Sequence, residues 1–408
     1  MARARRDRLL LAGVVFTVLF AQVALYPDIP ALVSALGATP AAWGGDVDAV
    51  LSAGKWFLTA EFLGFVLFAG VWGAVSDSVG RRTPLVAAGA VLGAVSYLAL
   101  VVLPQTVGIS YAAVLAIRFL GGVATIGAFS LAITTLVDLG GGHGRNMGAA
   151  GIAIGLGTAL GAPVGGQLYA RGPFVPLVAA ACCMLAAGGL ALVVTDRTPG
   201  KSGTSPLAAV LELRERPQLG LPFALGFIDR LTAGFFALVG TVYFQTELGL
   251  DAAGTGVMLG LFFGPFALLQ YPFGRLSDRI GRVIPVAAGS LVYGLAVISV
   301  FLAPTLLSTG LAMVVVGVFG ALVAPATMAL VSDMAGETQR GTAMGGFNVF
   351  GSLGFLAGIV GGATVAAAYG FGAAFLAVGA TEVLIALVAF PLLLNADRQR
   401  ARGDENAA

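Results

Sequence analysis

Apolar runs that are each long enough to cross a lipid bilayer recur along the whole of this sequence. The stretches Leu9–Tyr26 and Thr83–Pro104 are examples, and a helix needs roughly 20 such residues to span the hydrocarbon core. Charged residues make up only 10% of the chain, whereas an average soluble domain carries about 25%. The chain is therefore expected to be a membrane protein that crosses the lipid bilayer many times.

The apolar runs predict twelve spans. Only helices and closed barrels satisfy the backbone inside lipid, and no run alternates with the period of two that barrel strands require, so the spans are predicted to be helices. The first run follows a basic segment, as in a signal peptide, but its length and the lack of a convincing cleavage site favour a retained span. The predicted spans cover residues 8–27, 52–74, 83–104, 110–136, 146–169, 173–195, 219–245, 253–274, 283–304, 309–332, 341–367 and 373–395.

Basic residues fall almost entirely on one side of this topology. Of the 22 Lys and Arg residues, 18 lie on the side of the N-terminus and only Lys55 and Arg171 on the other. Basic loops remain in the cytoplasm, and an even number of spans returns the chain to its starting side. The sequence therefore predicts an all-α protein of the plasma membrane. Both of its termini are predicted to lie in the cytoplasm.

A polar segment divides the chain into two halves of six spans. Residues 196–217 have the Pro, Gly and Ser content of a linker and separate an N-terminal half, 1–195, from a C-terminal half, 218–408. The second span of each half is followed by the same charged turn, GAVSDSVGRR and GRLSDRIGR, as in transporters with parallel repeats. The turn residues are Gly73, Asp77, Gly80, Arg81 and Arg82, and then Gly274, Asp278, Arg279, Gly281 and Arg282.

A glycine-rich span is the fifth span of each half. Small residues four positions apart let helices approach closely in lipid, so packing alone accounts for any one of these glycines as well as a functional role does. Their ordered recurrence in both halves favours a function. The first copy holds Gly148, Gly157, Gly161, Pro163, Gly165 and Gly166, and the second holds Gly354, Gly358, Gly361 and Gly362.

These motifs resemble those of the major facilitator superfamily over essentially the whole chain. The doubled turn is similar to that family's G-x-x-x-D-[RK]-x-G-[RK]-[RK] signature, from which Ser78 and Val283 depart. The segment RFLGG, which begins at Arg118, is similar to a signature of proton-coupled members. The fifth span is similar to the glycine signature of antiporters, although Ala162 occupies the proline position and Pro163 comes one place late. The resemblance implies alternating access, with spans one, four, seven and ten around the cavity.

The resemblance also implies a gate at the cytoplasmic side. In the family, the first aspartate of the turn meets the start of span eleven, and pseudo-symmetry directs the second to the start of span five. Asp77 and Asp278 are therefore expected to latch the halves together when the transporter faces outward. Since Ser78 weakens the first copy, Asp77 is expected to depend on its helix end and on Arg81. The alternative is that the basic residues serve topology alone, but that role requires no aspartate.

Ionisable residues inside the predicted spans are the candidates for proton coupling. A charge at the bilayer centre costs about 2.5–3.5 kcal/mol on insertion scales, so each one invites a functional hypothesis. Glu61 and Arg118 lie at similar depth, either as a static bridge or as an acid that changes its protonation beside a modulating arginine. Gly121 and Gly122 are expected to clear space for the arginine side chain. The five candidates are Glu61, Arg118, Asp229, Arg230 and Glu382.

Asp229 and Arg230 are adjacent near the predicted midplane of span seven. Adjacent helix positions point about 100° apart, so one side chain is expected to face the cavity and the other a neighbouring helix. The cavity lining of the family favours Asp229 as the titrating acid, and the alternative is a structural pair with other partners. Glu382 lies in span twelve, which is peripheral in the family, and is interpreted mainly as a satisfied interior contact.

Aromatic residues of the second half are directed at the presumed cavity. Apolar walls with few polar groups suit a bulky lipophilic or amphipathic substrate, although phenylalanines in spans also serve packing or face lipid. The cavity candidates are Gln22, Phe235, Phe236, Tyr243, Phe266, Gln270, Phe347 and Asn348.

The sequence thus predicts a secondary active transporter, functional as a monomer, in which proton entry drives export of a small molecule. Glu61 and Asp229 are the expected coupling carboxylates, with Arg118 as their modulator. A symporter or facilitator for a polar metabolite remains an alternative, and a membrane scaffold or receptor is a more distant one. One histidine and two adjacent cysteines argue against a metal or haem site, and no enzyme activity, cofactor or nucleic-acid partner is expected.

Overall fold

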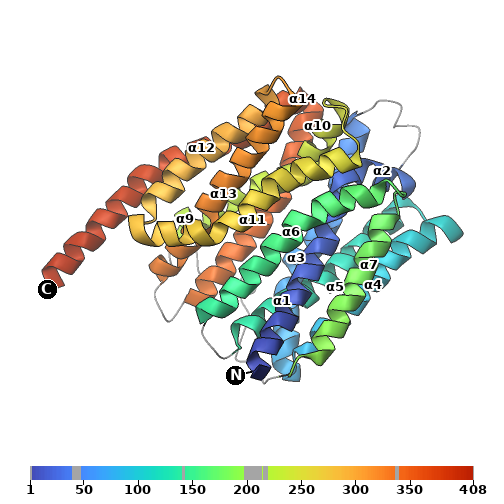
Figure 1. Ribbon diagram of the computed structural model, residues 1–408, viewed down its shortest axis with the longest axis horizontal. Coiled ribbons are helices and arrows are strands. Elements are labelled where there is room, and N and C mark those ends of the chain that lie inside the picture. The colour runs from blue at the N-terminus through green and yellow to red at the C-terminus, as the bar shows by residue number, and fades with distance from the viewer. Residues whose placement is uncertain are drawn as a thin grey trace.

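The computed structural model describes residues 2–38, 47–139, 143–196, 214, 219–335 and 340–407. Within these ranges the regular elements are all helices, and eleven are long and apolar enough to cross a membrane. Figure 1 shows the helices side by side in one elongated bundle, with the N-terminus at its lower end. The elements are α1 (Ala2–Val23), η1 (Tyr26–Asp28), α2 (Ile29–Ala35), α3 (Val47–Val79), α4 (Thr83–Thr106), α5 (Tyr111–Val137), α6 (His143–Tyr169), α7 (Val175–Val193), α9 (Gly220–Phe235), η4 (Phe236–Gly240), α10 (Thr241–Thr246), α11 (Ala252–Ile280), α12 (Val283–Leu302), α13 (Leu306–Ala335) and α14 (Arg340–Ala407).

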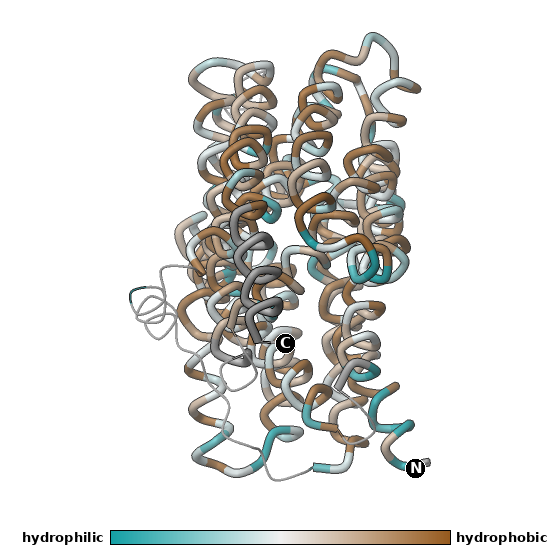
Figure 2. Tube along the Cα trace, turned by 90° about the vertical axis from the view of Figure 1, so that its left-hand side faces the viewer, coloured by the Kyte–Doolittle hydropathy of each residue, from teal (hydrophilic) through white to brown (hydrophobic). Residues whose placement is uncertain are grey.

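Several helices extend beyond the apolar runs that predict them. The predicted span 83–104 nearly coincides with α4, but α3 begins five residues before and ends five residues after the predicted span 52–74. Apolar length reports the thickness of hydrocarbon, whereas a helix can continue into the headgroup region. As a consequence, Asp77 and Asp278 lie on the last turns of α3 and α11 and not in loops. Figure 2 shows hydrophobic residues along the helices and hydrophilic stretches at the ends of the bundle, including the N-terminus.

The first span is interrupted near its end. After α1, a 3₁₀ turn (η1) leads into the short helix α2, which ends at Ala35, eight residues beyond the predicted end of the span. Pro27 and Pro30 lack backbone donors and favour helix starts over helix interiors. Asp28 caps α2 by accepting a hydrogen bond from the backbone nitrogen of Ala31 at 3.1 Å.

The seventh span contains a π-helical segment. The helices α9 and α10 and the π-helical segment η4 between them form one continuous helix over Gly220–Thr246, close to the predicted span 219–245. All five residues of η4 are buried. Segments of π-helix are rare and occur frequently at functional sites, and no sequence pattern here predicts this one.

The last helix bends at Gly370, which divides α14 into a first arm and a second arm. Gly370 has a φ of +83°, a left-handed conformation that glycine adopts without strain. The apolar stretch Ala343–Leu394 covers 52 residues, and a straight helix of that length measures about 78 Å against about 30 Å of hydrocarbon. The predicted spans 341–367 and 373–395 correspond to the two arms (Figure 1).

The two halves of the chain meet along two lateral seams. On one seam, α6 packs against α11, where a Cβ at Gly155 would lie 2.8 Å from the Cβ of Ala267. On the other seam, α3 packs against the first arm of α14, and the rings of Phe62 and Phe355 stack with their centroids 4.3 Å apart. Both seams join helices that the predicted linker separates in sequence.

We call the end of the bundle that carries the α3–α4 and α11–α12 turns the basic end. At the opposite end the halves are in direct contact. There, Gln245 of α10 donates a hydrogen bond from Nε2 to the carbonyl oxygen of Pro27 in η1 at 2.9 Å. Gly54 of α3 faces η4, where an added Cβ would lie 2.6 Å from Cδ1 of Leu238. The first span of each half therefore takes part in closing this end.

The recurring glycines pack the fifth helix of each half onto the first helix of the same half. A Cβ at Gly157 of α6 would lie 2.8 Å from the carbonyl oxygen of Phe16 in α1, and Gly161 faces the next turn of α1. In the C-terminal half, Gly354 and Gly358 of the first arm face the backbone of α9 in the same way. These four glycines therefore let the fifth helix of each half approach the first helix closely.

Substituting Gly157 with alanine is expected to lower the thermal stability, whereas Gly148→Ala is not. The methyl group at position 157 must push α1 away from α6, at a cost of about 1–3 kcal/mol. At Gly148, on the same helix, no atom lies within 4 Å of an added Cβ, and alanine there gains helix propensity. Thermal unfolding in detergent measures both variants, and equal melting temperatures would exclude this packing role.

Candidate functional site

An ion pair is buried in the N-terminal half. Arg118 of α5 donates a hydrogen bond from Nη2 to Oε2 of Glu61 in α3, and the two side chains are 2% and 1% exposed. The guanidinium also lies over the rings of Phe57 and Tyr97, with its Cζ 4.7 and 5.5 Å from the ring centroids. The structure thus brings together two residues that the sequence predicts at similar depth.

Glycines bring α3 and α5 close enough for this ion pair. A Cβ at Gly64 would lie 2.7 Å from a backbone oxygen of α5, and Gly122 of α5 faces the backbone of Glu61. Gly121 faces a serine of α4. The prediction that Gly121 and Gly122 make room for the Arg118 side chain is therefore wrong, because they make room for the neighbouring helices.

Polar atoms around the ion pair are left without well-aligned hydrogen bonds. Gln22 of α1 lies beside Glu61, and Tyr97 of α4 lies beside Arg118. In the described part of the chain, no well-aligned hydrogen bond reaches Oε1 of Glu61, Nε2 of Gln22, Nε of Arg118 or the hydroxyl of Tyr97, although Gln22 lies within hydrogen-bonding range of Glu61 and Tyr97 within that of Arg118. An unsatisfied buried polar group costs about 1–3 kcal/mol. This cluster can therefore accept a water molecule, a proton or a polar group of a ligand.

A second polar cluster lies in the C-terminal half, between α9, α12 and α14. Thr232 of α9 donates a hydrogen bond from Oγ1 to Oε1 of Glu382 in the second arm at 3.0 Å, and both side chains are buried. Asp229 precedes Thr232 by three positions on α9 and interacts electrostatically with Glu382 and with Tyr293 of α12. Glu382 therefore belongs to a cluster of acids and is more than an isolated peripheral contact.

Asp229 and Arg230 have different neighbours. Asp229 is 9% exposed, and its Oδ1 has no hydrogen-bond partner among the described residues. Arg230 donates a hydrogen bond from Nη2 to Oδ1 of Asn348 in the first arm at 3.1 Å. The sequence favours Asp229 as the cavity-facing residue, but the structure turns it towards α12 and the second arm, and Arg230 has the exposed partner.

The aromatic cavity candidates of the C-terminal half form a packed core. Phe235, Phe236 and Tyr243 are buried and pack on Phe375 of the second arm, with ring centroids 4.9, 6.0 and 4.9 Å apart. Phe347 is also buried and packs against α9. The aromatic composition therefore serves packing at these four positions, and it does not line a cavity there.

The other cavity candidates lie in three different places. Gln22 is buried beside the ion pair of the N-terminal half. Phe266 and Gln270 of α11 are half-buried, and Phe266 lies against α13. Asn348 is exposed and binds Arg230. These four positions do not form one continuous site.

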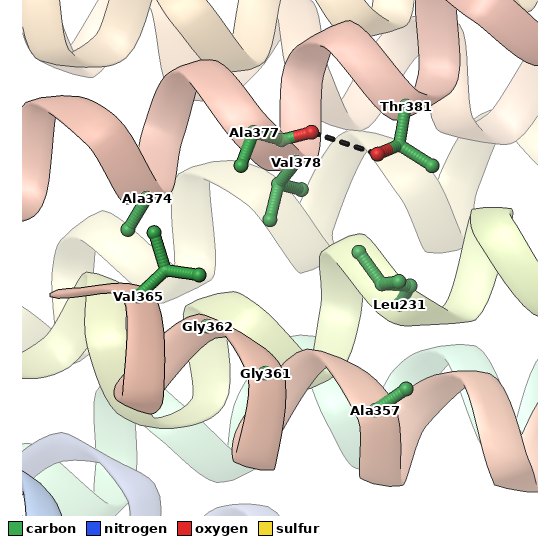
Figure 3. Close-up of a pocket in the computed structure, with 9 residues that line it drawn as sticks. All are labelled: Leu231, Ala357, Gly361, Gly362, Val365, Ala374, Ala377, Val378 and Thr381. Atoms are coloured by element: carbon green, nitrogen blue, oxygen red, sulfur yellow. Dashed lines mark hydrogen bonds between the residues drawn. The ribbon is translucent and has the colours of Figure 1, made fainter. Parts of the chain in front are cut away.

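A small crevice separates α9 from the two arms of α14. Figure 3 shows the arms on either side of it, and its volume is about 130 Å³. The hydroxyl of Thr381 donates a hydrogen bond to the carbonyl oxygen of Ala377 at 2.8 Å and so is already satisfied (Figure 3). The lining residues are Leu231, Ala357, Gly361, Gly362, Val365, Ala374, Ala377, Val378 and Thr381. This lining is apolar apart from the threonine, so it offers packing surface and no acid–base chemistry.

The first charged turn is built around Arg82. Gly80 ends α3 with a φ of +68°, which glycine allows. Arg82 is only 2% exposed; it binds Asp138 at the end of α5 and lies 4.0 Å from Asp77. The backbone nitrogen of Arg82 also donates to Oδ1 of Asp196, at the end of the N-terminal half, at 3.1 Å.

The second charged turn repeats this construction. Gly281 has a φ of +84°, and Arg282 binds Asp278 at 2.7 Å and Asp333, near the end of α13, at 3.2 Å. Burial opposes the charge on Arg282, but the hydrogen bonds to both aspartates raise the pKa of its guanidinium. Each arginine thus ties a motif aspartate to the fourth helix of its own half. An aspartate at the end of the fourth span of each half is the sequence signal that could have identified these partners.

The predicted latches between the halves are not among the described contacts. Asp278 binds Arg282 of its own half and is 64% exposed, and one contact of Asp77 is with Arg82. The side chains of residues 336–342, at the start of predicted span eleven, lie outside the described residues, so the first latch stays a prediction. Arg81 pairs with Asp196 at 3.4 Å, where the sequence predicts a role beside Asp77. The remaining motif residues lie on the last turns of α3 and α11 and are Gly73, Gly274 and Arg279.

Known proteins support one family for this chain. The model of the Major Facilitator Superfamily matches residues 11–236 and 222–408. An uncharacterised MFS-type transporter of Methanocaldococcus jannaschii is 32% identical over 168 residues, which cover 40% of this chain and 42% of that protein. The class G tetracycline resistance protein of Vibrio anguillarum is 28% identical over 239 residues, which cover 57% of this chain and 58% of that protein. The chain thus matches less than two thirds of the length of either relative.

The arrangement of the helices agrees with this family. A D-xylose–proton symporter of known structure superposes with a TM-score of 0.73, over 93% of this chain and 96% of that chain, at 17% identity. At that identity the similarity concerns the fold. Because the family model covers nearly the whole sequence, this chain is a member of the Major Facilitator Superfamily of membrane transporters.

Proposed function

We propose that this chain is a secondary active transporter that works by alternating access and exports a small lipophilic or amphipathic molecule in exchange for protons. The observation that carries the proposal is the presence of buried acids in both halves, Glu61 beside Arg118 and Asp229 beside Glu382. Ionisable groups are costly inside a membrane and mark ion or proton pathways. The antiporter-like glycine pattern of α6 and the similarity to a tetracycline resistance protein support export.

We propose a topology of twelve spans with both termini in the cytoplasm. The two arms of α14 supply the last two spans, because each is long enough to cross the hydrocarbon on its own. The 18 basic residues on the side of the N-terminus support a cytoplasmic location of that side by the positive-inside rule. The linker 196–217 then joins two six-helix halves on the cytoplasmic side of the plasma membrane, and the monomer is the functional unit.

In this topology the described structure corresponds to an inward-facing state. The hydrogen bond from Gln245 to Pro27 closes the outer end, and at the cytoplasmic end Asp278 binds Arg282 of its own half. Transport then requires the outer contacts to open and the latches of Asp77 and Asp278 to form between the halves, as in rigid-body domain rotation.

Proton symport or facilitated transport of a polar metabolite is the second candidate. The unsatisfied polar atoms around Glu61 suit a polar ligand, and the fold is shared with a D-xylose–proton symporter. A scaffold or receptor that moves nothing has no use for acids buried in both halves, so it is not favoured.

Proteoliposomes that contain a pH-sensitive dye distinguish these functions. Tetracycline and tetraphenylphosphonium serve as amphipathic probes and D-xylose as a polar probe, with protein-free liposomes as the control. We expect an amphipathic probe to drive protons in the direction opposite to its own movement. Proton movement in the same direction as the probe would establish symport, and probe movement without protons would establish a facilitator; both results contradict the proposed antiport.

A further inference from the structure

The two halves neutralise their buried acids in different ways. In the N-terminal half, the carboxylate of Glu61 has the guanidinium of Arg118 as its counter-charge. In the C-terminal half, neither Asp229 nor Glu382 forms an ion pair within the described residues. Arg230 is next to Asp229 in sequence, but its guanidinium is hydrogen-bonded to Asn348. Two acids in one cluster are therefore left without a basic group in contact.

Asp229 lies one helical turn before Thr232 on α9, and Thr232 is the residue that binds Glu382. Residues three positions apart on a helix are neighbours on one face, so Asp229 and Thr232 point the same way. The hydroxyl of Thr232 donates its hydrogen bond to Oε1 of Glu382 at 3.0 Å. Oδ1 of Asp229 lies on the same face, is buried and has no partner among the described residues. This oxygen is available to take part, together with the carboxyl group of Glu382, in binding a proton.

Close packing prevents Glu382 from turning away. A Cβ at Gly294 of α12 would lie 2.8 Å from the Cβ of Glu382, and one at Gly379 would lie 2.6 Å from the carbonyl oxygen of Gly294. The second arm and α12 are therefore in backbone contact at this level. In the described part of the chain, the other titratable groups that act on the pair are Tyr293 of α12 and Arg230 of α9.

We propose that Asp229 and Glu382 form a single proton-binding site in the interior of the C-terminal half, and that this pair holds the transported proton. Two carboxylates that interact in a medium of low dielectric disfavour the doubly charged state, so the site binds a proton where Glu61 instead binds an arginine. A proton on Oδ1 of Asp229, which has no partner among the described residues, removes one of the two negative charges of the pair. The inference rests on the proposed proton coupling and identifies its location.

The position of the pair on α9 connects it to the closed end of the bundle. Thr232 precedes the π-helical segment η4 by four residues, and the same continuous helix leads to Gln245 and its hydrogen bond with Pro27. Loss of the proton leaves two like charges between α9 and the second arm, which forces these elements apart. This repulsion acts on α9, which continues into α10 and its contact between Gln245 and Pro27. Release of the proton therefore favours opening of that outer contact between the halves.

Infrared difference spectra recorded on either side of a pH jump test the site directly, because a protonated carboxyl group has its own C=O band. The variants are Asp229→Asn, Glu382→Gln and the double variant, which are nearly isosteric, and their melting temperatures establish that they fold. We expect each single variant to remove the titrating band of the pair and the double variant to add nothing further. A loss that is additive over the two residues, or a band unchanged in all three variants, would overturn a shared site.

Proton flux in proteoliposomes tests the role of the pair in transport. We expect either single variant to reduce substrate-dependent proton flux by roughly tenfold or more, with no further loss in the double variant, as for groups that act as one unit. Thr381→Val, adjacent to Glu382 but facing the crevice, is the matched control and should leave the flux unchanged. Normal proton flux in the double variant would remove the pair from the mechanism while leaving antiport intact. Absence of proton flux in the unmodified protein would instead refute the proposed function, and the infrared band would still report the site.

Discussion

Arg118→Met is expected to destabilise the protein by about 3–5 kcal/mol, because it leaves the Glu61 carboxylate buried without its counter-charge. Glu61 is 1% exposed, and no second basic side chain contacts it among the described residues, so no other cation replaces the guanidinium. Stacking on Phe57 and Tyr97 is lost in the same substitution. Thermal unfolding of the purified protein in detergent, calibrated against denaturant unfolding, measures the effect.

The double variant Glu61→Gln/Arg118→Met is the control that separates charge from volume. It removes both charges, so it should recover most of the stability that Arg118→Met loses, as expected when buried ion pairs are replaced together. The single variant Glu61→Gln should be milder than Arg118→Met, because the remaining arginine keeps its two aromatic rings. If the double variant were as unstable as Arg118→Met, the arginine would act through packing and not through its charge.

Arg82→Ala is expected to destabilise the basic end more than the equivalent Arg282→Ala in the other half. The Arg82 side chain is 2% exposed and binds Asp138, whereas Arg282 is 21% exposed when it binds Asp278 and Asp333. Losing the contacts of the buried arginine should cost about 2–3 kcal/mol, and losing those of the more exposed one about 1 kcal/mol. The two melting temperatures, compared with that of the unmodified protein, check the difference.

High salt provides a second readout for this pair of variants. Screening weakens exposed ion pairs more than buried ones, so the difference between Arg282→Ala and the unmodified protein should shrink as salt is added. The difference for Arg82→Ala should persist. A reversed order of the two variants would mean that the turns differ in a way that burial does not explain.

Much of the fold follows from apolar length alone. The predicted spans 83–104 and 283–304 nearly coincide with α4 and α12. The repeated charged turn indicates two halves, and in the structure these halves pack along two seams. The misses occur where a helix is not bounded by hydrocarbon. The short helix α2 and the ends of α3 and α11 at the basic end continue past it, and the π-helical residues of η4 are as apolar as those of an ordinary helix.

Only some contacts of the candidate site could be predicted from the sequence. Glu61 and Arg118 could be paired from the sequence, because their depth follows from counting residues along two parallel spans. The contact of Glu382 with α9 could not, because Thr232 and Glu382 are 150 residues apart and meet only through the packing of three helices. Aromatic richness misled for a related reason: Phe235 and Phe236 are equally apolar in a cavity wall and in a core, and only tertiary packing decides between the two.

The bend at Gly370 has a mechanical consequence for the C-terminal half. One residue joins the two arms of α14, so the connection has no slack in which one arm could slide against the other. Gly354 of the first arm faces α9, and Phe375 of the second arm packs on Phe235 of the same helix. The two arms of α14 therefore contact α9 from two sides. A displacement of α9 is therefore expected to move both arms. The first arm packs against α3, so the movement is transmitted to the other half.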